Sequence, residues 1–76
     1  MGEHEERTWE ISGANTATVV QASNWVMALR RGFAALGLRL DRVNMDCQRL
    51  AQDCVVVNDR KREILYTVRA VACIQL

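Results

Sequence analysis

The sequence predicts a small α+β fold, a two-layer sandwich of one helix on a mostly antiparallel sheet, in the order β-β-α-β-β-β. Three observations lead to this prediction. Several short segments alternate polar and apolar side chains, one central segment has the 3.6-residue periodicity of a helix, and turn-forming residues separate them. With 76 residues, 50% of them hydrophobic, the chain has material for one core. We expect residues 1–7 to form a flexible acidic tail and residues 8–76 a single small domain.

The first two predicted strands form a hairpin. Residues 8–12 alternate polar and apolar side chains, and residues 13–16 have the Gly, Asn and Thr that are typical of a turn. Residues 17–22 include three β-branched side chains in a row, which favour extended structure. We therefore expect residues 17–22 to pair with residues 8–12.

A helix is predicted over residues 24–36. We expect the hydroxyl of Ser23 to cap its N-terminus and Gly37 to end it in the left-handed conformation. Five apolar side chains lie within one arc of about 100° and are predicted to face the core: Trp25, Val26, Leu29, Phe33 and Leu36. Small side chains form one margin of this stripe and should let the helix approach its own sheet closely: Ala28, Gly32 and Ala35.

A third strand is predicted after the helix. Val43, Met45 and Cys47 alternate with polar neighbours, as in a strand that has one wet face. The apolar phase changes after Leu40, so a bulge or bend is expected near Asp41. A turn is predicted over residues 50–53.

The last two predicted strands form a long hairpin. Residues 54–57 are an apolar, mostly β-branched run, five polar residues follow, and residues 63–72 return as the second arm. Within that arm, alternate apolar side chains share one face: Ile64, Tyr66, Val68 and Ala70. The final residues, 71–76, are unusually apolar for a chain end, and we expect them to be paired or covered.

The three cysteines are predicted to be buried, reduced thiols. Cys47, Cys54 and Cys73 are an odd number and include no C-x-x-C pair. Each lies in an apolar or alternating run, where cysteine behaves as a small hydrophobic residue. An intersubunit bridge or one adventitious disulfide is the alternative.

No catalytic or metal-binding constellation can be assembled from the sequence. The only histidine, His4, lies in the acidic tail, so neither a nucleophile with its base nor a tetrahedral zinc set is recognisable. Turn and surface roles suffice for the four aspartates, which are Asp41, Asp46, Asp53 and Asp59. The four glycines form no phosphate-binding loop. We therefore expect no enzymatic activity, no cofactor and no metal.

No membrane association is expected either. The sequence contains no run of about 18 apolar residues, and its N-terminus is acidic rather than basic and apolar, unlike a secretion signal. A cytoplasmic location follows as an expectation.

Basic side chains supply the candidate partner-binding residues. The formal net charge is +1, but nine basic residues face six acidic ones outside the tail. The strongest cluster is Arg60, Lys61 and Arg62, to which we add Arg42 and Arg69. A nucleic-acid-binding protein that uses an arginine-bearing sheet face and this basic hairpin tip is the alternative function. The aromatic residues do not favour it, because they fall on predicted core faces.

The leading functional hypothesis follows from the incompleteness of so small a domain. An open sheet has edges whose unpaired backbone groups are commonly satisfied by a strand from another chain. We expect a non-enzymatic protein-protein interaction or adaptor module with a regulatory role. Its partner would be a larger protein, or the chain itself in a homodimer.

Overall fold

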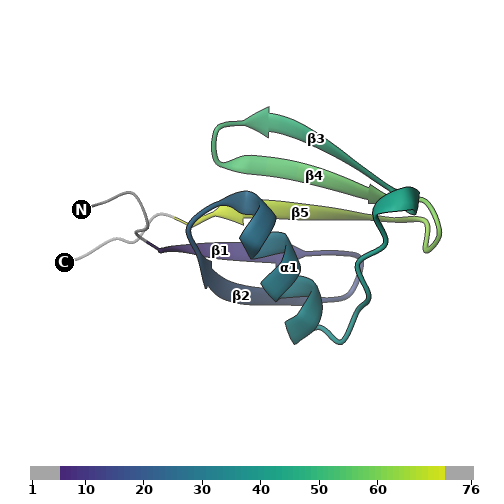
Figure 1. Cartoon of the computed structure of the whole chain (residues 1–76), viewed down its shortest axis with the longest axis horizontal. Coiled ribbons are helices and arrows are strands. Elements are labelled where there is room, and N and C mark those ends of the chain that lie inside the picture. Colours follow the sequence, from purple (N-terminus) through teal and green to yellow (C-terminus); the bar gives the residue numbers. More distant parts are fainter. Residues whose placement is uncertain (1–5, 72–76) are drawn as a thin grey trace.

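The computed structural model describes residues 6–71 and confirms the predicted fold class (Figure 1). Within these residues, five antiparallel strands form one sheet in the order β2-β1-β5-β4-β3, so that β2 and β3 are its edges. The elements along the chain are β1 (Arg7–Ser12), β2 (Ala17–Ala22), α1 (Trp25–Ala35), a 3₁₀ turn (Arg42–Asn44), β3 (Met45–Ala51), β4 (Cys54–Asp59) and β5 (Ile64–Ala70).

Pairing between β1 and β5 joins the two ends of the domain. The hairpins β1–β2 and β4–β5 are confirmed as predicted. In the centre of the sheet, Ile11 of β1 lies opposite Val68 of β5. This long-range pairing makes β5 the middle strand and leaves β3, which pairs only with β4, at the far edge.

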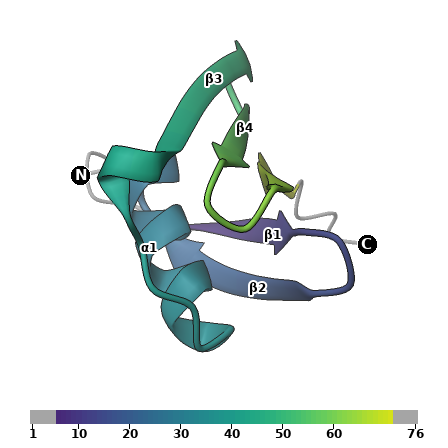
Figure 2. The same ribbon diagram turned by 90° about the vertical axis from the view of Figure 1, so that its right-hand side faces the viewer.

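The helix covers only part of one sheet face. It packs across β2, β1 and β5, and the view along the strands shows β3 projecting away from it (Figure 2). The helix-facing side of β3 therefore lacks the second layer that covers the other edge. This asymmetry decides where the exposed surfaces of the domain lie.

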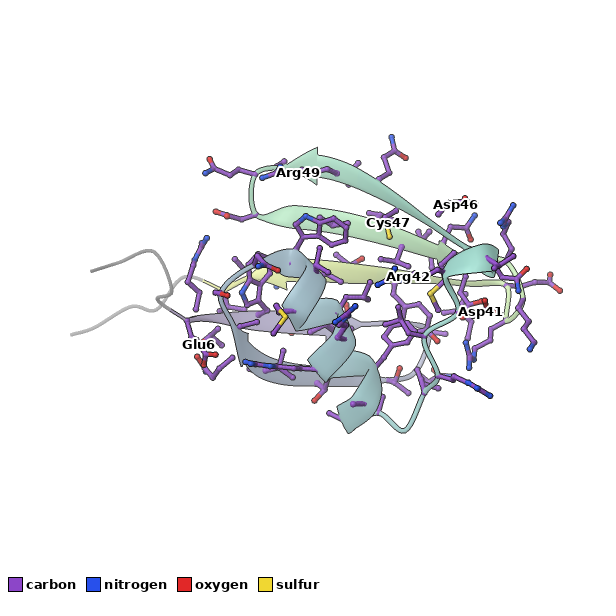
Figure 3. All side chains as sticks on the ribbon, viewed as in Figure 1. Glu6, Asp41, Arg42, Asp46, Cys47 and Arg49 are labelled. Atoms are coloured by element: carbon purple, nitrogen blue, oxygen red, sulfur yellow. The ribbon has the colours of Figure 1, made fainter. Side chains whose placement is uncertain are left out.

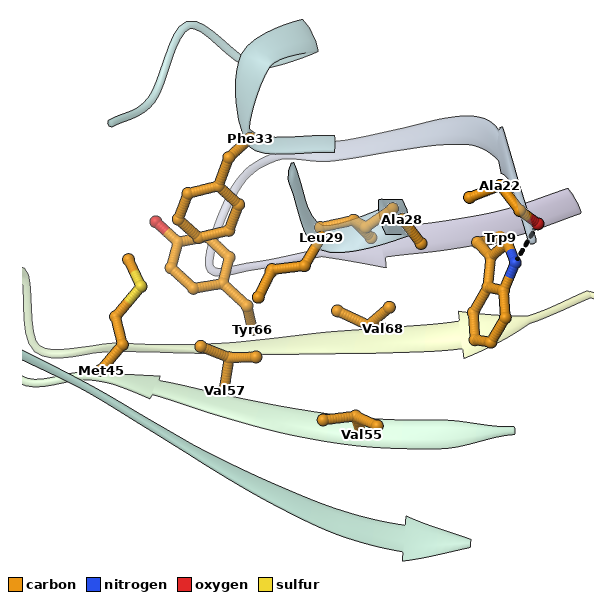
Figure 4. Close-up of a cluster of buried hydrophobic side chains, with 11 residues drawn as sticks. Trp9, Ala22, Ala28, Leu29, Phe33, Met45, Val55, Val57, Tyr66 and Val68 are labelled. Carbon is orange, nitrogen blue, oxygen red and sulfur yellow. Dashed lines mark hydrogen bonds between the residues drawn. The ribbon is translucent and has the colours of Figure 1, made fainter. Parts of the chain in front are cut away.

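The core lies between the helix and the central strands (Figure 4). The Trp9 indole Nε1 donates a 3.0 Å hydrogen bond to the carbonyl of Ala22, which satisfies its buried polar atom. The rings of Phe33 and Tyr66 pack with centroids 4.8 Å apart and tilted by 60°. The buried hydrophobic residues are Trp9, Ile11, Ala22, Ala28, Leu29, Phe33, Met45, Val55, Val57, Tyr66 and Val68.

Asn24, and not Ser23 as predicted, caps the helix. Its backbone is extended (φ −152°, ψ 171°), and its side-chain Oδ1 accepts a 2.9 Å hydrogen bond from the N–H of Met27. An amide oxygen at this position satisfies one of the first-turn donors, which leaves no such role for the hydroxyl one residue earlier. At the other end, Gly37 has a φ of 72°, as predicted for the residue that ends the helix.

The buried helix face is rotated from the predicted stripe toward its small residues. Ala28, Leu29, Gly32 and Phe33 are buried, whereas Val26 is 43% exposed, so the prediction for Val26 was wrong. The reason is close approach: a Cβ on Gly32 would lie 2.7 Å from Cγ1 of Ile11. The predicted role of the small margin is thus confirmed for Ala28 and Gly32, whereas Ala35, its third predicted member, is exposed.

The third strand differs most from its prediction. It runs from Met45 to Ala51 instead of ending before Leu50, and residues 42–44 form a 3₁₀ turn whose N-cap is Asp41. The 3₁₀ turn supplies the bend that was predicted near Asp41, and the register shift of β3 lies further on, between Arg49 and Ala51. Val43 is 80% exposed, because neither the helix nor another strand covers this edge.

Two polar predictions also need correction. Cys47 is exposed rather than buried, since it lies on the uncovered edge strand, and Cys54 is half-buried. Asp59 has the turn role that was predicted, since it accepts hydrogen bonds from the N–H groups of Lys61 and Arg62, but it does so from a fully buried position at the end of β4. Cys73 and the apolar residues 72–76 lie outside the described residues.

Candidate functional site

The two edges of the sheet differ in how their outward backbone groups are used. In an antiparallel pair, residues alternate between those that bond the neighbouring strand and those that point away from it. At the β2 edge, the N–H of Gly13 donates to the carbonyl of Thr16 at 2.8 Å, which places the groups of Gln21 on the outer side. Nη1 of Arg31 donates to that outward carbonyl of Gln21. The helix therefore caps part of the β2 edge.

The β3 edge has no such cap. The N–H of Arg60 donates to the carbonyl of Asn44 at 2.8 Å, so Met45 and Asp59 are a non-hydrogen-bonded pair. By the same alternation, the backbone N–H and C=O groups of Met45, Cys47 and Arg49 point away from β4. Among residues 6–71, none of these outward groups has a hydrogen-bond partner.

The side chains of β3 are exposed on both sheet faces. Six of its seven residues are exposed, and Met45 is the exception. Figure 3 shows Asp46, Cys47 and Arg49 spaced along this outermost strand. Leu50, at the far end of β3, is 59% exposed. Exposed edge strands are sites where another chain can pair.

A cleft of about 220 Å³ separates β3 from the first turns of the helix. Apolar side chains from the helix, from the loop after it and from β3 form most of its wall, and two arginines complete it. No carboxylate lines it. The residues are Trp25, Val26, Leu29, Arg30, Leu40, Arg42, Met45 and Cys47. An apolar floor with a cationic rim therefore adjoins the open edge.

A second, basic depression of about 370 Å³ adjoins this cleft and shares Leu40 and Arg42 with it. It brings together three of the predicted partner-binding residues, with one more arginine and one carboxylate. Its lining is Arg39, Leu40, Asp41, Arg42, Lys61 and Arg62. Arg60 lies next to it and bonds the carbonyl of Val43 at 2.6 Å.

Arg69 is the predicted residue that does not join this group. Its register opposite Glu10 places it on the sheet face away from the helix, where its Nη2 lies 2.7 Å from Glu10 Oε1. Arg60 also has an acidic partner, since its Nε lies 3.3 Å from Oδ2 of Asp46.

Arg62 serves the hairpin turn itself. Its Nη1 donates to Oδ2 of Asp59 at 2.6 Å, and this hydrogen bond raises the pKa of the guanidinium. Of the five predicted residues, Arg60, Arg62 and Arg69 thus already hold a carboxylate.

Cys47 is exposed on β3 but is not activated as a nucleophile. Partial burial raises the pKa of its thiol, and the negative charge of Asp46 raises it further. A raised pKa keeps the thiol protonated at neutral pH, whereas reactive cysteines have lowered values. The thiol is thus a surface group of the strand edge.

The described part of the chain contains no group of three His, Cys, Asp or Glu side chains that could hold a metal. The single histidine, His4, lies outside it. No helix within residues 6–71 is long and apolar enough to cross a membrane. All four aromatic side chains lie inside that range, and each is buried or half-buried.

Sequence reasoning missed Arg31, Met45 and Arg49. The outward positions of Met45 and Arg49 follow from the register of β3 on β4, and the role of Arg31 follows from where the helix crosses the β2 edge. No local pattern in the sequence indicates the roles of these three residues. Together the fold and site define a small α+β domain whose β2 edge is partly capped by the helix and whose β3 edge, within residues 6–71, has no such cap. Comparison with known protein families, curated proteins and solved structures gives no match for this chain.

Proposed function

We propose that this chain is a non-enzymatic protein-protein interaction module that binds its partner by adding a strand to the outer edge of β3. One observation carries the proposal: β3 is exposed on six of its seven residues, and its outward backbone groups are unpaired within residues 6–71. Many recognition domains bind an extended segment in this way, with affinity from main-chain hydrogen bonds. An adaptor or regulatory role is consistent with such binding.

The cleft beside β3 adds a means of selecting the partner. Alternate side chains of an added strand point to the helix side of the sheet, where Trp25, Leu29 and Met45 offer apolar surface. Arg30 and Arg42 at the rim favour polar or acidic groups next to those side chains. A cytoplasmic location fits the thiols of Cys47 and Cys54, which are unpaired within the described residues.

Nucleic-acid binding is the second candidate, and the basic depression around Arg39, Arg42 and Lys61 is the observation that favours it. It has less support, because no fully exposed aromatic side chain is available for base stacking. A salt-dependent shift with single-stranded oligonucleotides, lost on replacing Arg60, Lys61 and Arg62 by Ala, is the result this alternative requires.

Site-specific photo-cross-linking in the producing cells tests the leading proposal. A photoactivatable amino acid replaces Leu50 on β3 or, as the matched control, Val19 on β2, because both side chains are 59% exposed. We expect a cross-linked partner from position 50 and none from position 19. Cys47→Pro, which removes an outward N–H of β3, should abolish the cross-link from position 50. No cross-link from position 50, equal cross-linking at both positions, or a product that survives Cys47→Pro would contradict the proposal.

A further inference from the structure

We infer that the strand added to β3 is β3 of a second copy of this chain, paired antiparallel about a two-fold axis at Cys47. This inference rests on the proposed function and names its partner. The two sheets then form one continuous sheet, in which both helices lie on the same face.

The register of the outward backbone groups favours a two-fold axis at Cys47. Before the register shift between Arg49 and Ala51, the residues of β3 that present these groups to a partner are Met45, Cys47 and Arg49. With the axis at Cys47, Cys47 exchanges hydrogen bonds with its own counterpart, and Met45 exchanges them with Arg49 of the second copy. Every outward group of both strands is then paired. With the axis at Asp46, Arg49 lies opposite Val43, which is outside the strand. With the axis at Gln48, Met45 lies opposite Ala51, which is beyond the register shift of β3.

The side chains that face each other across the two strands also favour an axis at Cys47. With the axis at Cys47, Asp46 lies opposite Gln48 of the second copy, in a pair where side chains approach closely. The carboxylate accepts hydrogen bonds and the amide of Gln48 donates them, so the pair is complementary. By symmetry this contact occurs twice. Arg60, 3.3 Å from Asp46, offsets the repulsion between the two aspartates, which are diagonal neighbours.

The neighbouring registers are less favourable. An axis at Asp46 places two aspartates directly opposite each other, and like charges in this position are destabilising. An axis at Gln48 faces Asp46 with Leu50, which gives the carboxylate no donor. An axis at Arg49 opposes two arginines. Only the register centred on Cys47 combines complete backbone pairing with complementary side chains.

Exposed apolar residues at the two ends of β3 also fit this arrangement. Val43 is 80% exposed just before the strand, and Leu50 is 59% exposed near its end. Antiparallel pairing brings the start of one β3 beside the end of the other. Each Val43 is thereby placed next to residues 50–51 of the second copy, where burial of apolar surface favours association.

Sedimentation of the full chain at micromolar to millimolar concentration tests the dimer. We expect a monomer-dimer equilibrium that Cys47→Pro weakens about thirtyfold or more, because two symmetric hydrogen bonds are lost. Val19→Pro, at an outward position of β2, is the matched control and should leave the dimerisation constant unchanged.

A charge change at the interface gives a second test of the dimer. Gln48→Asp, an exposed change that spares the fold, should weaken dimerisation. Adding Asp46→Lys to Gln48→Asp should restore dimerisation. A folded monomer at millimolar concentration overturns the inference.

Disulfide cross-linking tests the register. Residues in a hydrogen-bonded antiparallel pair have Cα atoms about 5.5 Å apart, within the range that a disulfide spans. With Cys54 and Cys73 replaced by Ser, we expect an added oxidant to link two copies through Cys47. Moving the thiol by Cys47→Ser with Gln48→Cys should greatly reduce the yield, since the two sulfurs then lie on diagonal positions. A higher yield from position 48 overturns the assigned axis.

The two proposals fail separately. If position 50 cross-links a different protein while the chain sediments as a monomer, strand addition at β3 stands and the self-pairing inference falls. If the chain dimerises but Cys47→Pro has no effect on the dimer or on cross-linking in cells, both fall.

Discussion

The buried carboxylate of Asp59 accepts a 2.6 Å hydrogen bond from Nη1 of Arg62, three residues further along the chain. Its other oxygen accepts two 3.1 Å bonds from the backbone N–H groups of Lys61 and Arg62. One acidic side chain at the end of β4 thus organises the basic hairpin tip. Arg62, one of the three residues of the basic cluster that stands out in the sequence, therefore stabilises the hairpin turn.

Replacement of Asp59 is therefore expected to destabilise the fold. Asp59→Ala leaves two backbone donors and a guanidinium without their acceptor, and we expect a loss of about 2–3 kcal/mol in the free energy of unfolding, measured with urea. Asp46→Ala, which removes an exposed carboxylate beside Arg60, is the control and should cost less than about 0.5 kcal/mol. Equal losses in the two variants would contradict this role for Asp59.

The same carboxylate predicts loss of stability in acid. Burial alone would raise the pKa of Asp59, but the hydrogen bond from Arg62 and the backbone N–H groups outweigh it, so its pKa is lowered. The pKa values of Asp53 and Asp41 are lowered too, through hydrogen bonds from Arg7 and from Asn44 respectively. A lowered folded-state pKa stabilises the fold above the unfolded value of about 3.9, and this contribution is lost as the pH falls through the folded-state pKa.

Urea midpoints measured between pH 7 and pH 2 should therefore fall most steeply below about pH 4. Asp59→Asn keeps a side-chain oxygen but cannot ionise. We expect this variant to be less stable at pH 7 and to lose less stability on acidification than the unaltered chain. An identical acid dependence in both proteins would show that Asp59 does not contribute to it.

The close approach of helix and sheet gives a third prediction. Ala normally stabilises a helix relative to Gly, but Gly32→Ala would place a Cβ 2.7 Å from Cγ1 of the fully buried Ile11. We expect destabilisation by about 1–3 kcal/mol instead. Combining it with Ile11→Ala should cost less than the sum of the two single changes, because the two shortest contacts, to Cγ1 and Cδ1 of Ile11, are removed. Additive losses would exclude this contact as the cause.

The start of the helix gives a matched pair of variants. Asn24→Ala removes the acceptor of the Met27 N–H bond and should cost about 1 kcal/mol in thermal or urea unfolding. Ser23→Ala changes an exposed hydroxyl one residue earlier and should be nearly neutral. A larger loss for Ser23→Ala than for Asn24→Ala would reverse the assignment of the cap.

Side-chain periodicity predicted the elements and the fold class well, because it reports which side chains face the same way. It does not report what covers a face. The alternation around Met45 and Cys47 predicted a half-buried strand, yet Cys47 is exposed because the long-range pairing of β1 with β5 leaves β3 beyond the reach of the helix. The helical arc of apolar side chains likewise placed Val26 inward, whereas the close fit of Gly32 on Ile11 turns it outward.

The same limit applies to the candidate site. Arg42, Lys61 and Arg62 were predicted as partner-binding residues and do lie around one depression, since clustered charge is visible in the sequence. The open edge of β3 depends on strand order and on hydrogen-bond phase. Both arise from pairing between distant segments, so no local pattern reports them.

Arg31 is the side chain that caps part of the β2 edge and so distinguishes it from the β3 edge. Arg31 occupies the outward carbonyl of Gln21 on β2, and its Nη1 also lies 2.9 Å from Oε2 of Glu6. Arg31→Ala frees that carbonyl, and a chain with two open edges can add strands at both, which gives open-ended assemblies rather than a closed pair. We expect sedimentation velocity to show species larger than a dimer that grow with concentration. Arg39→Ala, an exposed change in the loop between the helix and β3, frees no edge carbonyl and should not produce them. If Arg31→Ala sediments like the unaltered chain, Arg31 does not protect this edge, and the preference for β3 must come from the side chains of β3 itself.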